Sequence, residues 1–140
     1  MIPAADSAIL CVQAGRRRYA IAQGQIDQLC LLDPAGAPTD QHGRPLICRE
    51  LGPLLGEADE SGPGRRRAIT VALRRRSVAL LFDHIDNMGG GAQLATQPLS
   101  PLITRHLARP WFLGAVVYAG EPLLLLDLRR IATDVAIGAV

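Results

Sequence analysis

Lysine is absent from this chain of 140 residues, and all 15 basic residues are arginines. This absence excludes the lysine of a phosphate-binding loop, lysines that form Schiff bases, and serine–lysine catalytic pairs. The composition therefore removes several classes of enzyme before any motif is considered.

Cysteine is also scarce, with Cys11, Cys30 and Cys48 lying far apart in apolar surroundings. The three residues form no Cys-x-x-Cys pair, and an odd number argues against a disulfide framework. No histidine lies beside any of them in the sequence, as a catalytic thiol would require. We expect buried, reduced thiols.

Aromatic residues make up only 4% of the chain, and the net charge is +2. Both values argue against nucleic acid as a partner, because nucleic-acid surfaces need positive fields and stacking rings. The longest apolar run is far shorter than the roughly 20 residues of a membrane span, and the N-terminus lacks the features of a signal peptide. We expect a cytoplasmic protein that does not insert into a membrane.

The residues that could carry chemistry do not cluster in the sequence. His42, His84 and His106 lack the carboxylate or cysteine spacing of a metal site. Serine, histidine and aspartate do not assemble into the spacing of a catalytic triad. We therefore expect no metal, no cofactor and no catalytic residue.

An internal repeat is the main positive feature of the sequence. Residues 43–51 and 120–128 share one frame, in which Gly, a charged residue, Pro and Leu are followed by three residues, an acid and Leu. Self-similarity at a long spacing indicates one supersecondary unit that is built twice. Upstream, both halves also show a strand, an arginine turn, a second strand and an Ile-Asp-x-apolar element.

Apolar runs and turn residues predict the elements of each half. Strands are expected at 7–13, 19–22, 45–50, 67–73 and 77–82, with a closing hairpin at 114–129. Short helical segments are expected at 51–56 and 129–137, and a loop at 32–43. The spacing of Ile26 and Leu29 suits one helical turn or a strand, and both alternatives stay open.

The polar connector 57–64 divides the expected domain into two lobes. One lobe spans about residues 7–56 and the other about 65–131. The last residues of the chain are expected either to return to the first lobe or to fray.

The order of these motifs resembles the CheW-like domain, the adaptor of bacterial chemotaxis arrays. The resemblance runs from about residue 7 to residue 131, through matching segments at 8–12, 19–21, 26–29, 43–47, 50–51, 78–86, 112–114 and 127–129. Each motif alone is weak, since it consists of apolar strands and turn residues, so the signal lies in their order and spacing.

The resemblance implies a mainly β fold of two SH3-like five-stranded barrels packed side by side, with a few short helical turns. It also implies a non-enzymatic adaptor that couples the cytoplasmic tip of a methyl-accepting receptor to the regulatory domain of a chemotaxis-type histidine kinase. The positions that match family contact residues are Ile26, Gln28, Leu29, His42, Gly43 and, in the second repeat, Ile85.

One departure from the family pattern concerns the first repeat. The family carries an apolar strand ending in Asn-x-Arg-Gly before the first Gly-x-Pro-Leu strand, whereas this chain has Asp40, Gln41, His42 and Gly43 in a compressed connector. We therefore expect the first lobe to lack or shorten one strand and to leave an edge open. The alternative function is a divergent module that self-associates through this edge or serves another signalling complex.

Three arginine triplets, at 16–18, 65–67 and 74–76, are candidate basic patches. Two of them fall in expected hairpin turns and one in the connector, which favours solvated turns over a nucleic-acid surface. Contact with an acidic partner is the remaining alternative.

Overall fold

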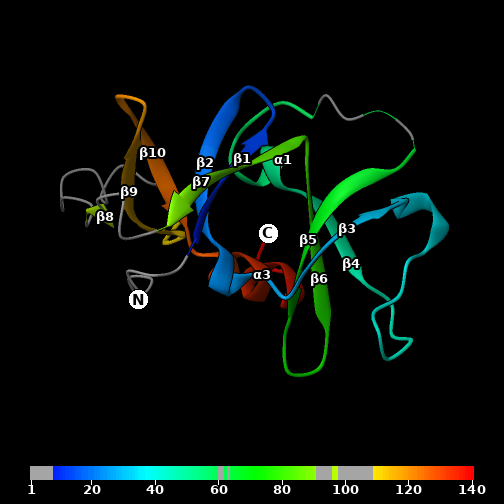
Figure 1. The fold of residues 1–140 in the computed structure, drawn as a ribbon. Helices are drawn as coiled ribbons and strands as arrows, with labels where there is room; N and C mark the ends of the chain where they lie inside the picture. The colour runs from blue at the N-terminus through cyan, green and yellow to red at the C-terminus, as the bar shows by residue number, and fades with distance from the viewer. Residues whose placement is uncertain (1–7, 60–61, 63, 91–95, 98–108) are drawn as a thin grey trace.

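A computed structural model describes residues 8–59, 62, 64–90, 96–97 and 109–140. The strands are β1 Ala8–Ala14, β2 Arg17–Ala22, β3 Gln28–Leu32, β4 Ile47–Glu50, β5 Arg66–Ala72, β6 Ser77–Phe82, β7 His84–Gly90, β8 Thr96–Gln97, β9 Phe112–Tyr118 and β10 Glu121–Leu126. The helices are α1 Leu51–Leu54 and α3 Leu128–Ala136, and 3-10 turns occur at η1 Gln23–Gln25 and η2 Pro34–Gly36 (Figure 1).

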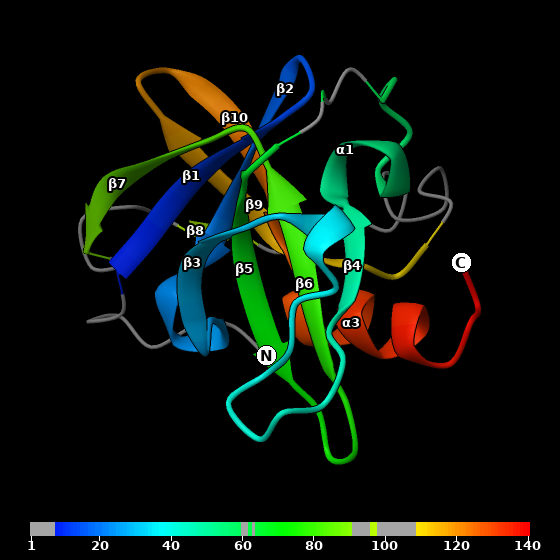
Figure 2. The same cartoon turned by 90° about the vertical axis from the view of Figure 1, so that its right-hand side faces the viewer.

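Two sheets form the two lobes of the fold. One sheet has six strands in the order β7-β1-β2-β10-β9-β8, and the other has four in the order β3-β5-β6-β4 (Figure 2). The two-lobe, mainly β arrangement expected from the sequence is confirmed. Each lobe is an open sheet, however, rather than a closed five-stranded barrel.

The two sheets do not follow the division of the sequence at 57–64. The six-stranded sheet combines β1 and β2 with β7, β9 and β10, whereas the four-stranded sheet combines β3 and β4 with β5 and β6. Each hairpin therefore pairs with strands from the other half of the chain. Hydrophobic periodicity predicts which face of a strand is buried, but it does not specify the neighbouring strand.

Both faces of the central strands are buried, which explains their nearly continuous apolar sequences. Alternate residues of the inner faces meet in one large core between the sheets, which includes Val12, Ile21, Ile69, Leu80 and Leu126. Among the described residues, the cluster on the outer face of the six-stranded sheet has seven buried members, and that on the four-stranded sheet has three. The outer core of the smaller lobe is therefore incomplete.

The internal repeat explains this difference between the sheets. In the larger sheet β10 is parallel to β2 and is also paired with β9, an antiparallel strand. In the smaller sheet β4 is parallel to β6, but the counterpart of β9 is reduced to one isolated bridge between Thr39 and Pro45. The expected loss of a strand in the first repeat is thus confirmed.

The C-terminal helix α3 closes the core between the sheets. The Asp127 carboxylate caps the helix by accepting a hydrogen bond from the Arg130 N–H at 3.2 Å, and Leu128, Ile131, Ala132 and Val135 are buried. The Arg49 guanidinium on β4 donates to the carbonyl of Val140 at 2.8 Å. The end of the chain thus contacts β4, and its return to the first lobe stays a prediction.

Candidate functional site

The edge strand β3 resolves the open question at residues 26–29. The chain passes through the 3-10 turn η1 and then pairs with β5 from Gln28 to Leu32. The Asp27 carboxylate accepts a hydrogen bond from the N–H of Ala72, which fixes the start of β3 against β5. The Asp33 carboxylate accepts from the N–H of Ala35 at 3.0 Å and turns the chain away after β3.

Two leucines on β3 are unusually exposed. Leu29 is 47% exposed and Leu31 is 61% exposed. Their alternation along the strand places both on one face, opposite Ile69 and Arg67 of β5. Single exposed apolar residues are common on protein surfaces, but an adjacent pair on an unpaired sheet edge favours contact with another chain.

A groove of about 660 Å³ lies beside β3 on the outer face of the smaller sheet. It runs between the strands and the 38–46 loop, which crosses in front of this sheet in Figure 2. Its lining comprises Asp27, Gln28, Cys30, Leu31, Leu32, Pro38, Thr39, Asp40, Gln41, Leu46, Thr70, Ala72 and Ser77. We call it the β3 groove. It opens on the lobe that lacks a counterpart of β9.

The turn at Asp40 forms one wall of this groove. Asp40 accepts hydrogen bonds from the N–H groups of His42 at 2.8 Å and Arg44 at 3.0 Å, and pairs with the Arg44 guanidinium at 3.1 Å. Partial desolvation acts to raise the pKa of Asp40, but these hydrogen bonds and the Arg44 charge outweigh it and lower the pKa below the ordinary value. Gly43 has a φ of 76°, a left-handed conformation that glycine adopts without strain.

Four of the six predicted contact residues lie in two parts of this region. Gln28 and Leu29 are exposed on β3, and Gln28 lines the β3 groove. His42 and Gly43 are exposed in the turn but are not among the lining residues, although the neighbouring Gln41 is. The structure therefore brings Gln28 and the turn to one groove.

Ile26 and Ile85 are positioned differently from the other predicted contact residues. Both are half-buried and pack against the core between the sheets. Ile85 belongs to β7, where it lies opposite Val12. Their role as contact residues stays a prediction, and Leu31 is the exposed apolar residue that the sequence reasoning missed. The alternation in residues 28–32 could have indicated it once the strand was assigned.

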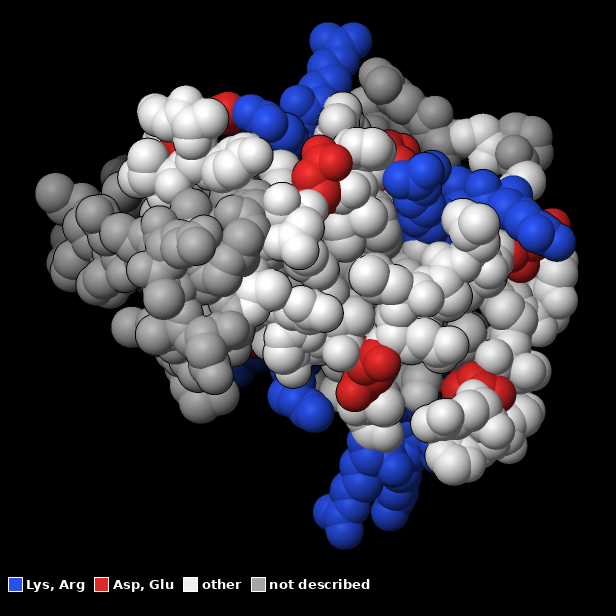
Figure 3. All heavy atoms as spheres, in the orientation of Figure 1, with Lys and Arg blue, Asp and Glu red and all other residues white. Residues whose placement is uncertain are grey.

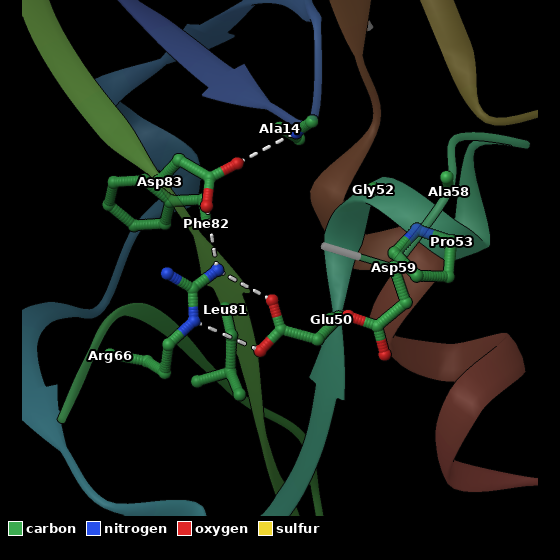
Figure 4. A pocket seen from close by; sticks show the side chains of 11 residues that line it. Ala14, Glu50, Gly52, Pro53, Ala58, Asp59, Arg66, Leu81, Phe82 and Asp83 are labelled. Carbon is green, nitrogen blue, oxygen red and sulfur yellow. Dashed lines mark hydrogen bonds and ion pairs between the residues drawn. The ribbon is translucent and has the colours of Figure 1, made fainter. Parts of the chain in front are cut away.

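A second cluster, of charged residues, joins the ends of several strands (Figure 4). The Arg66 guanidinium pairs with Glu50 at 2.7 Å and with Asp83 at 2.9 Å. Asp83 also accepts from the N–H of Gly15 at 2.8 Å, in the turn between β1 and β2. Hydrogen bonding to Glu50 is the main cause that raises the pKa of Arg66. The adjoining cavity of about 20 Å³ has room for only about one water molecule, so we interpret this cluster as a structural junction.

The thiols and histidines show no arrangement typical of catalysis in the described part of the chain. Burial raises the pKa of Cys11, Cys30 and Cys48, which disfavours the reactive thiolate. Among the described residues, no group of three or more His, Cys, Asp or Glu could hold a metal ion. His106 lies outside those residues.

None of the helices among the described residues is long and apolar enough to cross a membrane. The longest of them, α3, has nine residues.

Comparison with known proteins identifies the fold. No protein-family model matches the chain, and no curated protein sequence matches it. Among solved structures, the chain is similar to the scaffolding protein TtCheW from Thermoanaerobacter tengcongensis, with a TM-score of 0.63 and 11% sequence identity. The similarity covers 86% of this chain and 88% of the other.

The chain therefore has the two-lobed fold of CheW-type scaffolds. The similarity extends over nearly the whole of both chains. At 11% identity it defines the fold alone.

Proposed function

We propose that this protein is a non-enzymatic adaptor of chemotaxis-type signal transduction. It couples the cytoplasmic tip of a methyl-accepting receptor to the regulatory domain of a histidine kinase in the cytoplasm. The observation that carries the proposal is the pair of leucines, 47% and 61% exposed, on an edge strand of a CheW-type fold. An adaptor needs such a protein-binding edge and needs no catalytic group.

The proposed contact surface is centred on β3. Leu29 and Leu31 supply apolar area, and their strand offers unpaired backbone groups to a partner. Gln28 and His42 add exposed polar groups, while Gly43 shapes the turn beside the groove. Ile26 and Ile85 are half-buried against the core between the sheets, and the proposal gives them a secondary part in binding.

Calorimetry with the kinase regulatory domain encoded in the same genome tests the role and the surface together. The double variant Leu29→Gln, Leu31→Gln removes apolar area worth about 2 kcal/mol in all, so we expect roughly thirtyfold weaker binding. The matched control is Val117→Gln on β9, because Val117 is 46% exposed and lies on the other sheet. The control should bind like the unmodified protein.

The two parts of the proposal fail differently in this experiment. No binding by the unmodified chain to any chemotaxis kinase or receptor of that genome would exclude the adaptor role. Binding that the leucine substitutions leave unchanged would keep the role and exclude β3 as the surface.

A second candidate function is a module that self-associates. It is supported by β4, which in the described part of the chain has no antiparallel neighbour like the one that β9 provides for β10. An open edge of this kind can accept a strand from a second copy. Light scattering over a wide concentration range tests this candidate. A mass that rises to that of a dimer supports it, and a constant monomer mass excludes it.

A further inference from the structure

The three arginine triplets differ in how their charges are neutralised. In the first, Arg17 pairs with Glu57 at 3.1 Å and Arg18 pairs with Glu121. In the second, Arg66 is held between two carboxylates. In the third, at 74–76, all three side chains are exposed and none pairs with a carboxylate among the described residues.

The unneutralised arginines project at one tip of the molecule. They occupy the turn between β5 and β6, which a hydrogen bond from the N–H of Leu73 to the carbonyl of Arg76 closes at 2.8 Å. The Arg44 guanidinium donates to the carbonyl of Arg75 at 3.1 Å and steadies the turn. This turn forms the lower tip in Figure 1, where Figure 3 shows basic side chains extending into solvent.

An apolar surface adjoins this turn. A shallow cleft of about 390 Å³ lies between the arginines and the end of α3, with Leu73, Thr133, Ala136 and Ile137 in its lining. Ile137 is 71% exposed, the highest value among the large apolar residues that are exposed in the described chain. Positive charge and exposed apolar area therefore meet at one place.

We propose that this arginine–isoleucine surface binds an acidic protein segment in which an apolar side chain is flanked by carboxylates. Arginine matches a carboxylate with two parallel hydrogen bonds, and the cleft beside Ile137 accepts the apolar side chain. No intramolecular carboxylate among the described residues competes for these arginines.

The same lining disfavours two other anionic partners. Single-stranded nucleic acid needs aromatic stacking surfaces, and no aromatic residue lines the cleft. A membrane surface needs a broad apolar face for insertion, whereas this patch offers one strongly exposed isoleucine.

The surface is separate from the one proposed for the kinase. The β3 groove and the cleft share no lining residue, although Ala72 and Ser77 of the groove adjoin Leu73 and Arg76 of the cleft in the sequence. The two proposals can therefore fail independently, since Leu29 and Leu31 are no part of this cleft.

Binding of a fluorescently labelled synthetic peptide of about twelve residues, measured by anisotropy, tests the proposal at low and high salt. The first peptide carries one leucine among glutamates, the second has serine in place of leucine, and the third has glutamines in place of glutamates. We expect the first to bind tightest and the third not to bind. Raising the salt should weaken binding, because exposed charges are screened.

Variants of the protein test which residues bind the peptide. Arg74→Glu with Arg75→Glu should weaken binding of the first peptide by about tenfold or more, and Ile137→Ser should remove the preference for leucine over serine. The control, Arg65→Glu with Arg67→Glu, reverses two charges of another triplet and should change the affinity less than about twofold. Circular dichroism melts establish that each variant is folded.

Three results would overturn the proposal. One is the absence of binding by the acidic peptides, and another is unchanged affinity in the Arg74, Arg75 variant. The third is tighter binding, through the same arginines, of an oligothymidine strand or of phosphatidylserine vesicles, which would assign the surface to nucleic acid or to a membrane.

Discussion

Replacement of Arg66 by methionine should destabilise the fold more than the loss of an exposed charged side chain would. The guanidinium makes two hydrogen bonds to Glu50, at 2.7 and 3.2 Å, and one to Asp83 at 2.9 Å. The side chains of Arg66 and Glu50 are only 16% and 18% exposed, so solvent compensates little for the lost pair. Methionine keeps the apolar stem but leaves the Glu50 carboxylate without its cation.

The size of the effect follows from this burial. Removing one partner of a fully buried ion pair costs about 3–5 kcal/mol, and an exposed pair is worth about 0–1 kcal/mol. The partly exposed pair lies between these limits, and we expect a loss of about 2 kcal/mol in the free energy of unfolding. For a chain of this length that corresponds to a fall in Tm of about 8 °C.

Urea denaturation followed by circular dichroism measures this loss. The control is Arg67→Met, because Arg67 is exposed and should change stability by no more than about 0.5 kcal/mol. Adding Glu50→Gln to Arg66→Met removes the unpaired charge and should recover about 1 kcal/mol. A loss below about 0.5 kcal/mol in Arg66→Met would refute the view that this cluster ties the strand ends together.

The remaining predictions concern a turn, a thiol and a carboxyl group. Gly15→Ala should lower the stability measured by thermal denaturation by about 1–2 kcal/mol, because φ is +67° and the new Cβ would lie 3.0 Å from the Glu57 Cβ. The control is Gly24→Ala, whose new Cβ would meet no atom within 4 Å. Equal losses in the two variants would contradict the prediction. Cys11 should react with iodoacetamide more slowly than free cysteine because burial raises its pKa, and rapid labelling of the folded protein would contradict the prediction. An NMR titration should place the pKa of Asp40 below the ordinary value of about 3.9. The ionised carboxylate then stabilises the fold above about pH 3.9, and this stabilisation is lost as the pH falls through the lower pKa of the folded protein. An ordinary or raised pKa would contradict the hydrogen bonding described at this turn.

The repeat in the sequence predicted much of the fold. The shared frame of residues 43–51 and 120–128 led to β4 and β10, which occupy equivalent positions beside β6 and β2. It also predicted the missing counterpart of β9, because the connector before β4 lacks an apolar run. Local patterns suffice for such features because they depend on alternation and turn residues.

Pairing between strands distant in the sequence could not be predicted in the same way. The spacing of Ile26 and Leu29 fits a helical turn as well as a strand, and pairing with β5 decides between them. The exchange of hairpins between the two sheets likewise depends on contacts that no single segment encodes. Lobe boundaries drawn from the connector therefore do not match the sheets.

The candidate site was predicted only in part for the same reason. Gln28 and Leu29 were predicted from the resemblance to the CheW-like domain, whereas the exposure of Leu31 depends on the position of β3 at the edge of the sheet among the described residues. The β3 groove lies between β3 and the 38–46 loop, where the first repeat has only the bridge between Thr39 and Pro45. Both features depend on how the rest of the chain packs around β3, which the local sequence does not encode.

Sedimentation velocity of a three-component mixture tests the adaptor role most directly. The mixture contains this protein, the regulatory domain of the cognate histidine kinase and a cytoplasmic fragment of the cognate receptor. The adaptor role predicts a ternary species that disappears when this protein is omitted and that the Leu29→Gln, Leu31→Gln variant weakens. Sedimentation of the three components as separate species, at concentrations above those of known adaptor binding, would contradict it.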